Sequence, residues 1–440
     1  MDVFRRNINN IFVIFVLSHL IIWTLVPTLT NQNLPLDTIE ALAWGSNLDW
    51  GFNKHPPASA FFPELFYKII GPQDWAYYLL SQIFVIISFY YVFKLANKIL
   101  KNSIFSLISV FLLEAIFFYN FTTPEFNVNV CQLPFWSVVV YYSWKIYHNK
   151  KIELKDCILV GMFAAIGFLS KYLFLYLLIS IDLLFIYYIF FKKTIKFDFK
   201  YLIIFEVFIV LLLPHLIWLH NNDYITISYG LMRTGLEDTS YLDHIKYPVF
   251  FFLKQIGILI PFFILIILLV KKIKLKINFK DKKLIFLIFI NFLPIFLMLI
   301  TSIVTGSKIR TMWMTPFYLF FGVLFVYIFQ SQINIKKIDL FFYGFLFLYF
   351  LSPIMYSLES LNNTDKRTDY PGKEIATKVQ IIWDKDFDKE IQFVTGNEWK
   401  AGNLSYHLKS RPTWEGFIND EILKNSSQFI CIDDVCLGRY

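Results

Sequence analysis

Charged side chains are scarce in this chain of 440 residues. They make up 17% of the sequence, against about 25% in an ordinary soluble domain. Hydrophobic residues reach 57% and aromatic residues 20%, which is more apolar surface than a soluble fold of this size can hide. The composition therefore excludes a disordered protein, a coiled coil and an ordinary soluble enzyme, and it makes lipid the solvent for most of the chain.

Familiar motifs of other enzyme classes are also missing. The sequence has no Walker phosphate loop, no Gly-x-Ser-x-Gly motif, no His-Glu-x-x-His motif and no Cys/His cluster with metal spacing. Basic residues interleaved with aromatic ones indicate a membrane interface here, so no nucleic-acid partner is expected. Of the four cysteines, Cys131 and Cys157 lie in apolar runs, whereas Cys431 and Cys436 lie near the end of the chain. The last two form either a disulfide in an oxidising compartment or two unpaired thiols.

Long apolar runs alternate with short lysine-rich gaps. A spanning helix needs about 20 apolar residues, and the candidate spans are 9–28, 75–94, 103–119, 128–147, 156–170, 172–191, 201–219, 248–270, 284–304, 313–330 and 338–357. Residues 156–191 are interpreted as a hairpin that turns at Ser170 and Lys171. We therefore predict an α-helical polytopic membrane protein with about 11 transmembrane helices, and we expect the first run to be a retained anchor.

The positive charges predict the orientation of these spans. Basic residues are retained on the cytoplasmic side, and a cytoplasmic N-terminus with Arg5 and Arg6 places the lysine-rich gaps on that side too, including Lys271 to Lys283 and Lys336 with Lys337. Eight basic residues of the membrane part then fall on or near the outer side: Lys54, Lys68, Lys171, Arg233, Lys246, Lys254, Lys308 and Arg310. This excess on the outer side calls for an explanation other than topology.

Composition divides the chain into two domains. Residues 1–357 form the predicted transmembrane module, which has a large first outer loop at 29–74. Residues 358–440 have the composition of a soluble protein, and short β-rich runs at Val379–Trp383, Ile391–Val394 and Phe429–Ile432 predict a small α/β domain outside the membrane.

Acidic candidates for chemistry lie at the outer boundary. Asp37 and Glu40 are three residues apart, so a short helix would place them on one face. Glu125 lies in a polar turn between two spans, and Glu114 lies within a span, where an acid is costly and therefore a candidate for function. Carboxylates at this depth can act as a general base or as a metal ligand. The alternatives are helix N-capping by Asp37 and an N-capping turn around Glu125.

Basic candidates on the same side would suit an anionic phosphate. Two prolines after His55 hold Lys54 and His55 on a rigid, extended backbone. The further candidates are Lys171, Lys308 and Arg310, with Arg233 as an additional one. The alternative for each of them is a snorkelling side chain or a topology signal.

Five short motifs give the chain a resemblance to a known family. They are Asp37 with Glu40, the aromatic-Asn-Lys-His-Pro-Pro stretch at 52–57, Thr-Pro-Glu-Phe-Asn at 123–127, Gly-Phe-Leu-Ser-Lys at 167–171, and the Ser-Lys before Trp313. In this order they resemble the GT-C glycosyltransferases that use polyprenyl-phosphate-linked sugars, such as lipid A aminoarabinose transferases and protein O-mannosyltransferases. A weaker likeness runs through residues 396–412.

The resemblance implies an inverting transfer of a sugar from a polyprenyl-phosphate carrier at the periplasmic face of a bacterial inner membrane. It gives Asp37 the role of the acid in the first loop, and it places Lys54 and Lys171 near the donor phosphate. Lipid A or another envelope glycolipid is the favoured acceptor, and a protein is the alternative one. Asn53 departs from the acid that aminoarabinose transferases carry there, so the sugar and any divalent cation remain open.

Two other functions compete with a transferase. A transporter or flippase of a lipid-linked sugar would share the many spans and the intramembrane acid Glu114. The sequence has no inverted repeat, however, and such a protein needs no folded outer tail. A structural subunit of an envelope assembly is a third possibility, but no feature of the sequence supports it.

Overall fold

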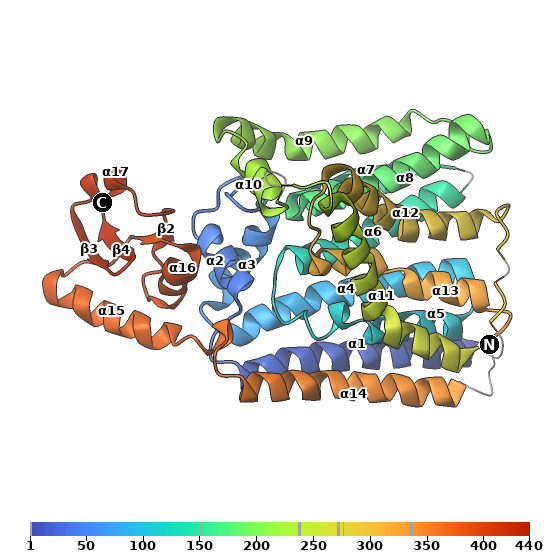
Figure 1. Cartoon of the computed structure of the whole chain (residues 1–440), viewed down its shortest axis with the longest axis horizontal. Helices are drawn as coiled ribbons and strands as arrows, with labels where there is room; N and C mark the ends of the chain where they lie inside the picture. Colours follow the sequence, from blue (N-terminus) through green and yellow to red (C-terminus); the bar gives the residue numbers. More distant parts are fainter. Residues whose placement is uncertain (1, 150, 236–238, 271–272, 276, 334–337) are drawn as a thin grey trace.

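The structure is a computed structural model that describes residues 2–149, 151–235, 239–270, 273–275, 277–333 and 338–440. Six lysines that entered the charge prediction lie outside the described residues: Lys150, Lys271, Lys272, Lys276, Lys336 and Lys337. Apolar sequence gives long helices that run roughly side by side, and the tail forms a separate lobe at one end of the bundle (Figure 1). The N-terminus lies at the opposite end.

Helices account for every predicted span. The bundle contains α1 (Asp2–Thr30), α4 (Asp74–Leu100), α5 (Ser103–Phe111), α6 (Val128–His148), α7 (Leu154–Ser170), α8 (Leu175–Ile186), α9 (Lys200–Asn221), α11 (Asp243–Leu269), α12 (Lys282–Thr305), α13 (Phe321–Phe329) and α14 (Ile338–Asn362). Short 3-10 segments extend three of them: η1 (Leu112–Ala115) follows α5, η3 (Tyr172–Phe174) precedes α8, and η6 (Thr311–Tyr318) precedes α13. The chain is therefore a multi-pass helical membrane protein.

The number of helices that could span a bilayer alone is smaller than the predicted eleven. In the described part of the chain, seven are long and apolar enough, and an eighth results if η6 and α13, which meet at a bend of 53°, count as one span. The remaining predicted spans are not long or apolar enough to count as spans by themselves. The α5 and η1 segment is short, and α7 has only 17 residues. Helix α6 has 21 residues but is less apolar, because it includes polar side chains such as Asn129, Gln132 and Ser137.

The hairpin predicted at Ser170 and Lys171 is confirmed. Helix α7 ends at Ser170, and the extended backbone of Lys171 starts the next segment. Close to the first residue of α7, Lys200 Nζ of α9 donates to the carbonyl of Ile152 at 3.0 Å. The start of α7 and the start of α9 therefore lie together, and Lys171 lies at the other end of the bundle.

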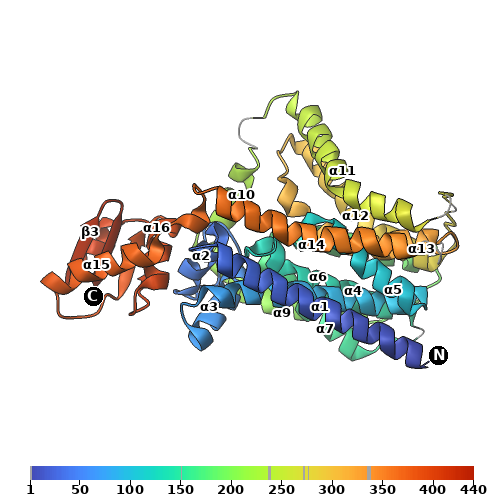
Figure 2. The same ribbon diagram turned by 90° about the horizontal axis from the view of Figure 1, so that it is seen from below.

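The first outer loop and the tail form the second part of the molecule. Helices α2 (Leu36–Gly45) and α3 (Ala58–Ile70) lie between the bundle and the tail, and α10 (Ile225–Arg233) lies beside them (Figure 1). Figure 2 shows α1 and α14 next to each other along the bundle, with α2 and α3 at its tail-facing end. This end carries most of the predicted site residues.

The tail is a small mixed α/β unit. Strands β1 (Phe393–Gly396), β2 (Thr413–Trp414), β3 (Gln428–Ile432) and β4 (Val435–Arg439) form a sheet of order β2-β1-β4-β3. The β1–β2 pair is parallel, and the other two pairs are antiparallel. Helices α15 (Gly372–Asp386), α16 (Glu398–His407) and α17 (Asp420–Lys424) complete it. Because α14 continues to Asn362, the boundary at 357 stays a prediction.

One predicted strand of the tail is wrong. Val379–Trp383 belongs to helix α15, where Ala376, Val379 and Trp383 are buried together. Their spacing of three and four residues places them on one helical face, and this period outweighs the β-branched composition of the run.

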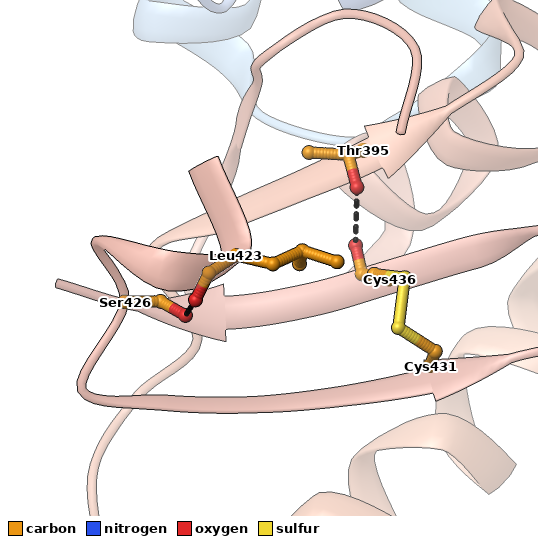
Figure 3. Close-up of a disulfide and its surroundings, with 5 residues drawn as sticks. All are labelled: Thr395, Leu423, Ser426, Cys431 and Cys436. Atoms are coloured by element: carbon orange, nitrogen blue, oxygen red, sulfur yellow. Dashed lines mark hydrogen bonds between the residues drawn. A yellow bond between two sulfur atoms is a disulfide. The ribbon is translucent and has the colours of Figure 1, made fainter. Parts of the chain in front are cut away.

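The two cysteines of the tail form a disulfide. Cys431 on β3 is bonded to Cys436 on β4 (Figure 3), and the two residues are directly paired in the antiparallel register. In the same view, Thr395 of β1 bonds to the backbone of Cys436 from the neighbouring strand. The alternative of two unpaired thiols is therefore wrong.

Candidate active site

Helix α2 presents both acids of the first loop to one cavity. Pro35 occupies the N-cap position of α2, and no side chain caps the helix. The alternative role of Asp37 as an N-cap is therefore wrong. Its spacing from Glu40 places both side chains on the same helical face. That face borders a cavity of about 380 Å³.

Seven of the ten predicted site residues line this cavity. They come from five separate segments of the chain: Asp37, Glu40, Lys54, His55, Lys171, Arg233 and Arg310. Asn129, Tyr229 and Trp313 also contribute to its wall. The cavity therefore brings acids and bases together at the end of the helical bundle that faces the tail.

Asp37 is an unusually basic carboxylate in this setting. Burial, reinforced by the neighbouring carboxylate of Glu125, raises the pKa of Asp37 to about 7. Glu125 does not line the cavity but lies behind Asp37. Its Oε1 accepts the backbone N–H of Asp37 at 3.0 Å. Burial raises the pKa of Glu125 as well. A carboxylate with a pKa near the working pH is well suited to accept a proton.

The turn around Glu125 caps the start of α6, as its alternative interpretation predicted, although the capping residue is Asn127 and not Glu125. The side chain of Asn127 accepts the backbone N–H groups of Asn129 and Val130 at the start of α6. Glu125 itself lines a second cavity of about 360 Å³. Its contact with the start of α2 makes it a support for Asp37.

Lys54 is held between two carboxylates. Its Nζ lies 2.9 Å from Glu40 Oε1 and 3.3 Å from Glu398 Oε1. Desolvation lowers the pKa of Lys54, but the two carboxylates more than offset this effect, so the pKa is raised. The pKa of Glu40 is also raised, mainly by burial. Lys54 is thus a charged group that is already paired, and not a snorkelling side chain.

Lys171 is the most buried base of the cavity. Its side chain donates to Asn129 Oδ1 at 2.6 Å and lies 5.0 Å from the ring centre of Trp313. Burial lowers the pKa of Lys171 to about 7, although the charge of Asp37 opposes the effect. Arg233 and Arg310 add two exposed guanidinium groups to the same cavity.

His55 has a different character from the other predicted bases. Burial lowers its pKa to about 3, and the charges of Lys171 and Lys54 contribute. At neutral pH the imidazole is therefore uncharged. It can exchange hydrogen bonds with a ligand, but it adds no positive charge to the cavity.

Two predicted residues lie away from the cavity. The side chain of Lys308 is exposed, and its backbone N–H donates to the carbonyl of Thr234 at 3.0 Å. Glu114 is buried inside the bundle, where its Oε1 lies 2.7 Å from His19 Nδ1. This contact joins α1 to η1 within the bundle, so the geometry makes Glu114 a packing partner.

No metal centre is evident from the side chains. Within the described ranges, no group of three or more His, Cys, Asp or Glu side chains could hold a metal ion. A divalent cation held partly by a substrate phosphate would need fewer protein ligands.

Sequence reasoning missed Glu398 as a residue of the site. It belongs to the tail, far along the chain from the first loop, yet its Oε1 contacts both Asn53 Nδ2 at 3.0 Å and Lys54 Nζ at 3.3 Å. The only signal in the sequence was the weak likeness of residues 396–412 to the tails of the resembled family. Spacing along the chain could not predict this contact.

Part of the chain matches a known protein family. Residues 54–218 match the family model described as dolichyl-phosphate-mannose-protein mannosyltransferase. The resemblance to the GT-C glycosyltransferases is confirmed. The matched segment begins at Lys54 and includes Lys171, and it covers less than half of the chain. A search of curated proteins finds no match.

A solved structure has a similar fold. The crystal structure of ArnT from Cupriavidus metallidurans bound to undecaprenyl phosphate matches with a TM-score of 0.63 and 10% sequence identity. The match covers 92% of this chain and 85% of that chain. The helical bundle and the tail together therefore have an ArnT-like fold.

Proposed function

We propose that the chain transfers a sugar from a polyprenyl-phosphate carrier to an acceptor. The observation that carries the proposal is the single cavity in which Asp37 and Glu40 face Lys171, Arg233 and Arg310. The family match at 54–218 and the ArnT-like fold support the same reaction class. Lipid A or another envelope glycolipid is the proposed acceptor, and a protein is the alternative.

The proposed reaction follows from the charges around the cavity. The bond between the anomeric carbon of the sugar and the phosphate oxygen breaks, and the phosphate leaves as an anion on its lipid. Lys171 and the two arginines stabilise that developing charge. The acceptor oxygen attacks the opposite face of the anomeric carbon, and Asp37 takes its proton. The product is an inverted glycoside, and no further reactant is needed.

The proposed location is the outer face of a bacterial cytoplasmic membrane. The lysine-rich turns are then cytoplasmic, and the cavity and the tail lie in the periplasm. The donor is anchored in the bilayer by its own lipid, so the site at the end of the bundle lies at the depth of its phosphate.

Asp37→Asn tests the proposed function. The substitution keeps the size of the side chain but removes the proton acceptor, so we expect transfer to fall by at least about a hundredfold. Mass spectrometry of lipid A, other glycans and envelope proteins would compare cells that lack the gene, complemented by the wild type or by the variant. The matched control is Asp365→Asn, an exposed acid of the tail.

The outcomes distinguish the functions. Loss of one sugar from one acceptor in the Asp37→Asn cells, with a normal protein level, supports the transferase and names the acceptor. Normal modification in those cells would overturn the assignment of Asp37. Accumulation of a lipid-linked sugar on the cytoplasmic side would instead identify a transporter.

A further inference from the structure

The tail is docked on the helix that carries the acids. Gly402 of α16 lies so close to α2 that an added Cβ would lie 3.1 Å from the side chains of Ile39 and Ala43. Arg411 extends the contact, because it donates to the carbonyl of Leu42 at 2.7 Å and to Glu64 Oε2 at 2.6 Å. The tail and the first outer loop therefore form one packed unit.

Glu398 is the residue of the tail that contacts Lys54 in the wall of the cavity. It is only 4% exposed and lies in the first turn of α16, where the helix dipole favours a negative charge. Its carboxylate bonds to Asn53 and Lys54 of the first loop. Glu398 itself does not line the cavity, so it contacts the site through Lys54.

The charges explain why this contact matters. A buried carboxylate is costly unless it is paired and hydrogen-bonded. Lys54 forms ion pairs with both Glu398 and Glu40. Lys54 therefore occupies a fixed point between the tail and α2, and it holds the Glu40 carboxylate against the cavity. Without Glu398, Lys54 would keep only one carboxylate, and the positions of Lys54 and Glu40 would no longer be fixed by the tail.

We propose that Glu398 is a positioning residue, through which the tail fixes Lys54 and Glu40 in the active site. The inference rests on the proposed function and assigns the tail a part in the reaction. Glu398→Gln keeps an acceptor for Asn53 but removes the charge. We expect kcat to fall about tenfold or more, with little change in the KM of the donor, because Glu398 lies outside the cavity.

A pH profile separates positioning from simple docking. The groups that face Lys54 are Glu40 on α2 and Glu398 on α16, and the charge of Glu398 contributes to the raised pKa of both Lys54 and Glu40. The charge of Asp37, also on α2, raises the pKa of Glu40 as well. The proposed positioning needs Glu40 to be ionised and paired with Lys54. Removing the charge of Glu398 lowers the pKa of Glu40, so the fall in kcat that protonation of Glu40 causes, in addition to that of Asp37, should move to lower pH. Glu398→Asp should restore the profile in part. An unchanged kcat and profile in Glu398→Gln would overturn the proposal.

Two control variants address the docking of the tail. Glu64→Gln weakens the contact with Arg411 without touching Lys54, and Asp434→Asn removes an exposed tail carboxylate that pairs with Lys400. Both should keep the wild-type pH profile. If Glu64→Gln reproduced the loss and the shift, docking alone would explain Glu398. If Glu398→Gln did not accumulate, Glu398→Asp would test the contact with Lys54 by a milder change, because it keeps the charge but shortens the side chain.

A measurement without substrate keeps this test independent of the proposed function. Acetic anhydride modifies neutral amines, and mass spectrometry can follow its reaction with Lys54 as a function of pH. Because Glu398 raises the pKa of Lys54, the amine should react at lower pH in Glu398→Gln than in the wild type. An identical reaction profile would contradict the pairing, whereas a shifted profile in an inactive protein would contradict only the proposed reaction.

Discussion

Lys171 and Lys54 line the same cavity but meet different surroundings. Lys54 lies between two carboxylates, whereas Lys171 has a neutral amide and an aromatic ring as its neighbours. Among the described residues, no carboxylate forms an ion pair with Lys171, so its charge is available to an incoming anion. We therefore assign the main contact with the donor phosphate to Lys171 and a positioning role to Lys54.

The pH dependence of the reaction should reflect Asp37 and Lys171. Asp37 is active when deprotonated, so kcat/KM should fall as the pH drops through its raised pKa of about 7. Lys171 is active when protonated, so kcat/KM should also fall as the pH rises through its lowered pKa of about 7. The expected profile is a narrow bell close to neutral pH.

Lys171→Arg tests the alkaline limb of this bell. A guanidinium stays protonated throughout the range, so the alkaline limb should disappear, whatever the change in the maximal rate. Lys68→Arg is the matched control, because Lys68 is an exposed base on α3. An alkaline limb that persists in Lys171→Arg would assign it to another group.

At the scale of elements, the bundle depends on close helix contacts. Helix α13 approaches α5 so closely that a Cβ on Gly322 would lie 2.0 Å from the backbone oxygen of Ser109. Small residues permit such contacts between membrane helices. A backbone atom cannot move aside as a flexible side chain can, so this contact fixes the distance between the two helices.

Gly322→Ala should therefore destabilise the bundle. Overpacking of this kind costs about 1–3 kcal/mol or more, which thermal unfolding in detergent would reveal as a lower midpoint. Gly257→Ala on α11 is the matched control, since no atom of the described residues lies within 4 Å of its added Cβ. Equal midpoints for the two variants would show that α5 and α13 can separate without cost.

At the scale of the whole molecule, the lysine-rich turns gather at one end. Lys145 pairs with Asp156 at 2.7 Å, and Lys283 Nζ donates to the carbonyl of Ile99 at 2.7 Å. The tail lies at the opposite end (Figure 1). Basic residues resist translocation, so this polarity favours a cytoplasmic lysine end and a periplasmic tail.

Single cysteines test the orientation. Lys385→Cys places an exposed thiol on α15, and Lys193→Cys places one in a lysine-rich turn. A membrane-impermeant maleimide should label the first in spheroplasts and the second only after permeabilisation. Cys131 and Cys157 are buried, and the unmodified protein serves as the control for them. The reverse labelling pattern would invert the proposed topology.

The sequence by itself determined the helical class, the mixed tail and most of the residues around the cavity. Apolar runs must be helical in lipid because their backbone groups have no other partners. The alternation of the lysine-rich gaps then located the hairpin at Lys171. Composition misled at Val379–Trp383, where it predicted a strand. The helical spacing of Ala376, Val379 and Trp383 is the sequence signal that fits helix α15. These are local properties, and a sequence displays them directly.

Only the tertiary structure decided which candidates share a site. It placed Lys308 and Glu114 outside the cavity, put Glu125 behind Asp37, and brought Glu398 from the tail to Lys54. Such contacts join segments that are far apart in the chain, so no spacing rule anticipates them. Whether a lysine is a free cation or a paired one depends on its neighbours in space, and that difference separates Lys171 from Lys54.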